Sequence, residues 1–146
     1  MAQLATVVNS IKFVERILMG LVFVALLVRF IFHFEPGTFL FVFSMGLALV
    51  YFPFGFYFIG KPAENYSYTT TVILGFIYAL GVIALLLSAN NLDSYRYPLI
   101  AGFFVLAALV VYLILKLRSA AYPSTFVNAQ FIRIGYIVLV NLIILL

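Results

Sequence analysis

The chain has 146 residues, of which 67% are hydrophobic and only 8% are charged. Soluble domains are roughly half apolar and a quarter charged, and a soluble fold of this length could not bury so much apolar surface. The chain has no cysteine, one histidine and four acidic residues, which excludes disulfides and thiolate chemistry and argues against a metal site. The net charge of +4 comes from scattered basic residues, a pattern that sets membrane topology and does not point to nucleic acid. The composition predicts an integral membrane protein.

The first sixteen residues place apolar side chains at helical spacing, with Lys12 and Arg16 among them. This pattern predicts either an amphipathic helix on the membrane surface or a downward extension of the first spanning helix. We favour the extension, because nothing between Phe13 and Ile17 breaks a helix. Residues 1–10 carry no basic n-region, so no cleavable signal peptide is expected.

Apolar runs further along the chain predict four spanning helices and a fifth that ends at the last residue. A helix needs roughly 20 mostly apolar residues to cross a bilayer. The expected spans are about 17–34, 38–59, 71–89, 98–115 and 125–146. Short polar connections separate them, and Pro98 is expected in the first turn of its helix, where its missing N–H costs nothing. The predicted fold is an all-α polytopic bundle of four to five transmembrane helices.

The basic residues predict the orientation of these spans. Six of them fall on one side of the layout: Lys12, Arg16, Lys61, Lys116, Arg118 and Arg133. The positive-inside rule then places the N-terminus in the cytoplasm, in the plasma membrane of a bacterium. With five spans the C-terminus lies outside, and with four spans and an interfacial last segment it stays inside.

Two regions of the sequence are similar to each other. Residues 24–52 and 82–113 both contain an apolar helix, a short polar turn and a second helix that ends in Val-Tyr. A parallel repeat of two helical hairpins would produce this order. Chance similarity between leucine-rich segments is the alternative.

Small residues recur at four-residue spacing, with Ser44 before Ala48 and Gly75 before Ala79. In a bilayer, small side chains allow helix backbones to approach closely. We expect these residues to pack helices within one bundle, in preference to forming a dedicated subunit interface.

Ionisable residues gather at the predicted outer side: Arg29, His33, Glu35, Asp93 and Arg96. Such a cluster could bind an ion, a lipid headgroup or a partner, with His33 titrating near neutral pH. The alternative is ordinary polarity at helix ends, although Arg29 lies deeper than an end residue needs to. No catalytic constellation accompanies the single histidine, so we expect neither an enzyme nor a cofactor.

The stretch VRFIFHFEPGTFLFVFSMGLALVYF, residues 28–52, resembles the N-terminal transmembrane hairpin of the GldL-type membrane subunit of the gliding and type IX secretion motor. Uncharacterised Bacteroidota membrane proteins share this hairpin. The resemblance is carried by Arg29, His33-Phe34, Gly37 and Gly46. It implies that residues 24–52 form a motor-associated hairpin. The basic residue precedes His33 by four positions, where the family has three. Residues 38–59 contain no acidic residue, so the resemblance does not extend to ion-driven activity.

We therefore expect a small non-enzymatic membrane subunit or accessory protein that packs against other membrane subunits or against itself in the lipid bilayer. The alternative is a small ion or proton channel or transporter that uses the outer charged cluster. A membrane-disrupting effector is a third class that so apolar a chain allows.

Overall fold

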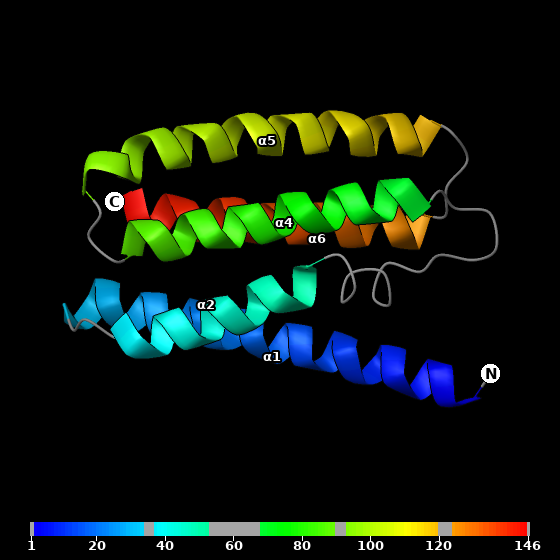
Figure 1. The fold of residues 1–146 in the computed structure, drawn as a ribbon, viewed down its shortest axis with the longest axis horizontal. Helices are drawn as coiled ribbons and strands as arrows, with labels where there is room; N and C mark the ends of the chain where they lie inside the picture. Colours follow the sequence, from blue (N-terminus) through cyan, green and yellow to red (C-terminus); the bar gives the residue numbers. More distant parts are fainter. Residues whose placement is uncertain (1, 34–36, 53–67, 90–92, 120–123, 146) are drawn as a thin grey trace.

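The computed structural model describes residues 2–33, 37–52, 68–89, 93–119 and 124–145, and these segments are helical with no strand among them. The helices are α1 (Ala2–Phe32), α2 (Gly37–Tyr51), α4 (Tyr68–Ala89), α5 (Asp93–Ser119) and α6 (Ser124–Leu145). Successive helices run in opposite directions, so the N- and C-termini lie at opposite ends of the bundle (Figure 1). The all-α prediction is confirmed.

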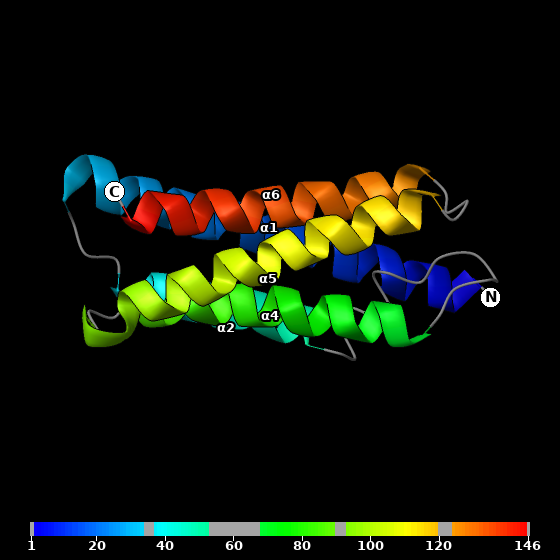
Figure 2. The same cartoon turned by 90° about the horizontal axis from the view of Figure 1, so that it is seen from above.

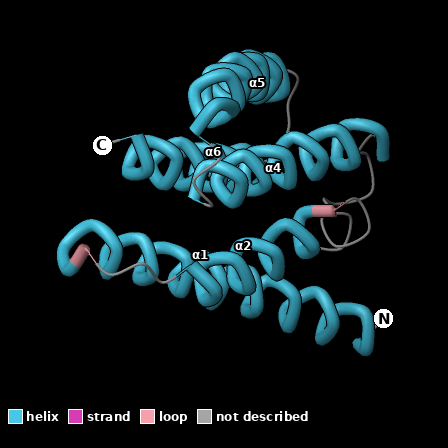
Figure 3. The backbone as a smooth tube through the Cα atoms, turned by 60° about the vertical axis from the view of Figure 1, so that its left-hand side comes forward, coloured by secondary structure: helices cyan, strands magenta, loops and turns pink. Residues whose placement is uncertain are grey.

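The helices form a layered bundle. In Figure 1, α1 and α2 form one layer, α4 and α6 form the next, and α5 covers the far side. Figure 2 shows the same bundle from above, where α6 lies along α1, α4 lies along α2, and α5 crosses obliquely. The tube view in Figure 3 shows that α5 lies farthest from the layer of α1 and α2. α4 contacts α2, α5 and α6 and is the central helix.

The core is filled by apolar side chains spaced three or four residues apart, which is the spacing that puts side chains on one face of a helix. α6 buries Ile134, Ile137, Val140 and Ile144 in this way. Gly81 of α4 also lies in this core. An added Cβ there would lie 2.8 Å from Cγ2 of Ile137, so the absence of a side chain lets α4 approach its neighbours.

The start of α1 follows the favoured prediction of an extended first helix, and the start of α5 does not. α1 runs without a break from Ala2 to Phe32, so residues 2–16 continue the helix that contains residues 17–32. α5 begins at Asp93 and contains Pro98 within it, so the prediction that Pro98 lies in the first turn was wrong.

Length and composition identify two helical segments as able to cross a membrane in the described ranges, Tyr97–Lys116 and Ser124–Ile144. Two shorter apolar helical segments are Gly37–Tyr51 and Val72–Leu87. In this alternating bundle the α1–α2 and α4–α5 hairpins point the same way with or without a duplication. The internal repeat therefore remains a prediction.

Candidate functional site

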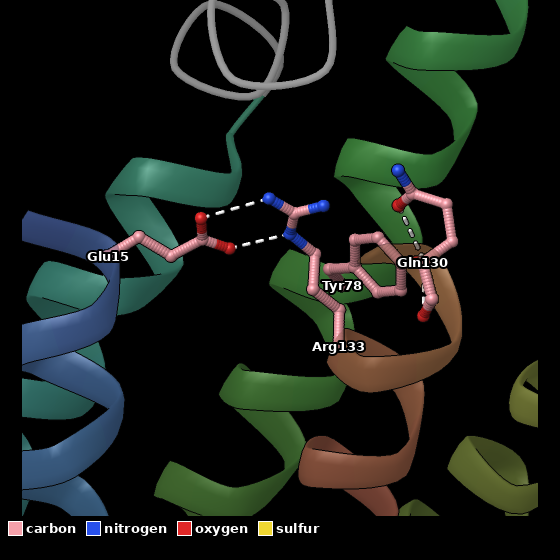
Figure 4. Close-up of polar contacts among 4 residues, drawn as sticks. All are labelled: Glu15, Tyr78, Gln130 and Arg133. Carbon is pink, nitrogen blue, oxygen red and sulfur yellow. Dashed lines mark hydrogen bonds and ion pairs between the residues drawn. The ribbon is translucent and has the colours of Figure 1, made fainter. Parts of the chain in front are cut away.

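A buried ion pair joins the first described helix to the last. Arg133 of α6 donates from Nε to Oε1 of Glu15 at 2.6 Å and from Nη2 to Oε2 at 3.0 Å. Figure 4 shows the carboxylate and the guanidinium facing each other between α1 and α6. Glu15 is only 4% exposed and Arg133 only 8% exposed. Two parallel charge-assisted hydrogen bonds fix both the distance and the orientation of the pair.

Helical periodicity brings the two charged groups inward. On α6, Gln130, Arg133, Ile137 and Asn141 follow one another at intervals of three or four residues and are all buried. Residues at this spacing lie on one face, so the face that packs against the bundle carries both apolar and polar side chains. On α1, Glu15 is buried while its neighbours Val14 and Arg16 are exposed. The carboxylate therefore points into the bundle, although the residues around it on α1 are mostly exposed.

Two tyrosines and a glutamine complete what we term the polar layer: Glu15, Tyr51, Tyr78, Gln130 and Arg133. The hydroxyl of Tyr78 donates to Oε1 of Gln130 at 3.0 Å. The ring of Tyr51 lies 5.6 Å from that of Tyr78, centroid to centroid. Both tyrosines interact electrostatically with Glu15 and Arg133. The polar layer thus connects α1, α2, α4 and α6 at one level of the bundle.

A second contact links α1 and α6 close to the polar layer. The hydroxyl of Tyr136 donates to the backbone carbonyl of Met19. This carbonyl lies one turn after Glu15, and Tyr136 lies almost one turn after Arg133. The two helices are therefore joined by adjacent polar contacts.

Three buried polar atoms have no hydrogen-bond partner among the described residues: Oγ of Ser44, Nε2 of Gln130 and Oδ1 of Asn141. The Nδ2 atom of Asn141 does donate, to the carbonyl of Ile137 at 2.8 Å and to that of Gly81 at 3.4 Å. Buried polar groups are nearly always paired. The core therefore retains hydrogen-bonding capacity that its own described side chains do not use.

The chemistry available in the polar layer is that of a compensated charge pair. Moving an ionised carboxylate and a guanidinium out of water costs several kcal/mol each, and close pairing with further hydrogen bonds offsets this cost. No group of three histidine, cysteine, aspartate or glutamate side chains lies together in the described part of the chain. The pair can hold helices together or respond to a proton or an ion.

The outer cluster predicted from the sequence is only partly described. Arg29 is half-buried, and His33 is exposed at the end of α1 with a φ of 51°. A residue with positive φ just after a helix is a common way to end it. Glu35 lies outside the described residues, and Asp93 and Arg96 belong to α5 with side chains that are not described. The end of α1 and the start of α5 do lie at the same end of the bundle (Figure 1). Because three of the five side chains are not described, the cluster itself remains a prediction.

The four small residues expected at helix contacts are all buried. Ser44 and Ala48 lie on α2, and Gly75 and Ala79 lie on α4. These two helices pack against each other.

Sequence reasoning missed Glu15, Gln130 and Asn141, and it placed Arg133 with the basic residues that set topology. The structure adds a role for Arg133 that the sequence analysis did not predict, because its side chain lies in the core and forms an ion pair. A signal was present in the sequence: polar residues at three- and four-residue spacing within an otherwise apolar helix lie on one face and need partners.

No protein-family model matches the chain, and no curated protein or solved structure matches it either. The functional argument therefore rests on the residues of the chain itself. The hairpin resemblance of residues 28–52 stays a prediction.

Proposed function

We propose that this chain is a polytopic integral membrane protein with a cytoplasmic N-terminus, and that it serves as a non-enzymatic subunit or accessory protein of a larger membrane complex. The observation that carries this proposal is the distribution of polarity. Large apolar side chains are exposed on all five described helices, as with Phe32 at 71% and Ile132 at 68%, while the Glu15–Arg133 pair is buried. Monomeric soluble proteins rarely expose such extensive apolar surface. A lipid bilayer is the environment in which such an apolar surface is stable.

The lengths of the helices support several crossings. At 1.5 Å per residue, the 22 residues of α4 and of α6 span about 33 Å, which matches a hydrocarbon core of about 30 Å. α1 and α5 are longer, with 31 and 27 residues. In this proposal all five described helices cross, and because their directions alternate, residues 2 and 145 lie on opposite sides of the bilayer.

The packing of the core favours a structural role over a conducting one. From the polar layer toward the C-terminal end of α6, the core is filled by buried apolar side chains such as Leu47, Leu85, Ile137 and Val140. A pore would need a continuous row of polar groups or water. In this proposal the Glu15–Arg133 pair closes the bundle, and the exposed apolar faces are available to lipid and to other subunits.

A small ion or proton transporter is the alternative function, and one observation favours it. Ionisable residues inside a membrane protein often mark ion pathways, and Glu15 is such a residue. Ser44 and Asn141 are further buried polar residues beyond the polar layer. In this alternative Glu15 would exchange Arg133 for a transported ion, and the outer cluster at Arg29 and His33 would form the opposite entrance.

The resemblance of the α1–α2 hairpin suggests which complex to examine first. A motor of the gliding or type IX secretion type is the first candidate, with the chain as an accessory component. α2, Gly37–Tyr51, contains no acidic residue, so we do not propose that this helix couples ion flow to movement.

The test is purification from the native membrane at native expression level after mild crosslinking, followed by identification of everything that copurifies. We expect a partner at constant stoichiometry. Recovery of the chain alone, as a monomer in mild detergent, would contradict the subunit proposal. Ion flux in liposomes that is lost in Glu15→Gln but retained in Lys116→Gln, which removes an exposed charge on α5, would favour the transporter.

A further inference from the structure

The N-terminal half of α1, about residues 2–17, is built differently from the rest of the bundle. The helix has 31 residues and is about 46 Å long, which exceeds the roughly 30 Å of a hydrocarbon core. Toward its N-terminus it diverges from α4, α5 and α6 (Figure 1). This part of α1 therefore reaches the headgroup level on the side where the N-terminus lies.

Basic and apolar side chains lie next to one another on this part of α1. Lys12 and Arg16 are one turn apart and share a face, and Arg16 is exposed. Phe13, Val14 and Ile17 are exposed beside them, with Phe13 at 65%. The only acidic residue of α1 is Glu15, and its carboxylate is bound by Arg133. The exposed charge of this segment is therefore positive.

The exposed apolar residues continue into the membrane-facing surface. Val14, Ile17, Leu21 and Val24 are all exposed, and their spacing of three or four residues makes them one stripe along α1. A stripe that begins among basic residues and continues along the bundle matches the transition from headgroups to acyl chains. A protein-docking face would more often end at a polar rim.

We propose that Lys12–Ile17 is a binding site for anionic phospholipids, in which Lys12 and Arg16 bind the headgroup phosphate while Phe13 and Ile17 contact the acyl chains. Basic residues near an anionic bilayer surface gain favourable energy from each such contact, and arginine can donate two parallel hydrogen bonds to a phosphate. This inference rests on the proposed membrane placement of the bundle. The inference adds to that placement the class of lipid that is bound and the residues that select this class.

The chain contains no tryptophan, so a single Phe13→Trp substitution provides the only indole signal. The variant is reconstituted in vesicles that contain either brominated phosphatidylglycerol or brominated phosphatidylcholine, with the remaining lipids unlabelled and the overall lipid composition constant. Bromine quenches indole fluorescence on contact. We expect phosphatidylglycerol to compete for the site on the order of fivefold better than phosphatidylcholine, as one or two basic contacts would give.

Three matched variants complete the test. In a Phe13→Trp background, Lys12→Gln with Arg16→Gln should abolish the lipid preference, whereas Lys116→Gln with Arg118→Gln, which removes the same charge from α5, should retain it. Val105→Trp, at a position on α5 that is 63% exposed, should be quenched by both lipids equally. Circular dichroism and thermal unfolding establish that each variant is folded.

The outcomes separate the lipid site from the membrane placement. If Val105→Trp is not quenched by either lipid, the proposed membrane placement itself fails. If Val105→Trp is quenched but Phe13→Trp shows no lipid preference, or loses it equally in both charge variants, the lipid site is overturned. Phe13→Trp that neither lipid quenches would also overturn it, because the segment would then be covered by a second copy of the chain or lie outside the bilayer.

Discussion

Arg133 and Glu15 are separated by 118 positions in the sequence, yet their side chains form a two-point ion pair with donor–acceptor distances of 2.6 and 3.0 Å. The pair joins α1 to α6, two helices that otherwise share less contact than α2 and α4 do. Removing one partner of a buried pair leaves an uncompensated charge, which costs more than the pair itself contributes. Loss of one partner should therefore weaken the closure of the bundle more than loss of both charges together.

Single substitutions in the ion pair should be strongly destabilising. We expect Glu15→Gln or Arg133→Gln to lower the free energy of unfolding by about 3–5 kcal/mol, measured by thermal or denaturant unfolding in mild detergent. The double variant Glu15→Leu with Arg133→Met removes both charges and should recover most of the loss. If the double variant loses as much stability as the sum of the two singles, the two residues do not act as a pair.

The hydrogen bond between Tyr78 and Gln130 should contribute measurably to stability. Tyr78→Phe leaves Oε1 of Gln130 buried without its donor, and such a loss costs about 1–3 kcal/mol. Tyr112→Phe is the matched control, because Tyr112 is exposed on α5, and it should change the unfolding temperature little. Equal effects of the two substitutions would argue against a role for this hydrogen bond.

Close packing at Gly81 should make this position sensitive to the smallest side chain. An added methyl group would overlap Phe103 and Ile137, so Gly81→Ala should destabilise the bundle by about 1–3 kcal/mol. Gly102→Ala provides the control, since nothing lies within 4 Å of a Cβ there. Alanine is the better helix former, so Gly102→Ala should leave stability unchanged or raise it by up to ~1 kcal/mol. A stabilising Gly81→Ala would show that α4 can move away from its neighbours.

Asn141 should be replaceable by leucine without loss of stability. Its Oδ1 has no partner within the described segments, and replacing a partly satisfied buried amide by an apolar group of similar shape is close to neutral. The test compares the unfolding temperature of the Asn141→Leu variant with that of the wild type. A loss of several degrees would indicate that the amide oxygen binds water or an ion, which would favour the transporter alternative.

The helical fold was predictable because the sequence alternates long apolar runs with short polar segments that contain proline or glycine, such as Glu35-Pro36-Gly37. The continuation of α1 through residues 2–16 was expected from the same pattern, since no helix breaker interrupts it. The start of α5 was not predicted correctly. A proline near a helix N-terminus is tolerated at several positions, so Pro98 alone did not determine where the helix begins.

The polar layer could not be read in full from the sequence. Glu15 lies between Lys12 and Arg16 and resembles an ordinary charge at a membrane surface, so nothing local indicates that it faces inward. Its partner is 118 positions away, and only the three-dimensional packing of α1 on α6 brings them together. Arg133 was the member of the pair that the sequence could have identified, because an arginine in the middle of an apolar helix requires a partner.

The most direct test of the account is a topology map made with single cysteines, which is straightforward because the chain has none. Cysteine replaces Ser10, Thr38, Tyr97 or Ser124, or is added after Leu146, and intact cells with a permeabilised outer membrane are treated with a membrane-impermeant maleimide. The account predicts labelling from outside at positions 38 and 97 and at the added C-terminal cysteine, and labelling at 10 and 124 only after the inner membrane is opened. Labelling of positions 10 and 38 from the same side would contradict it, because α1 would then not cross the membrane.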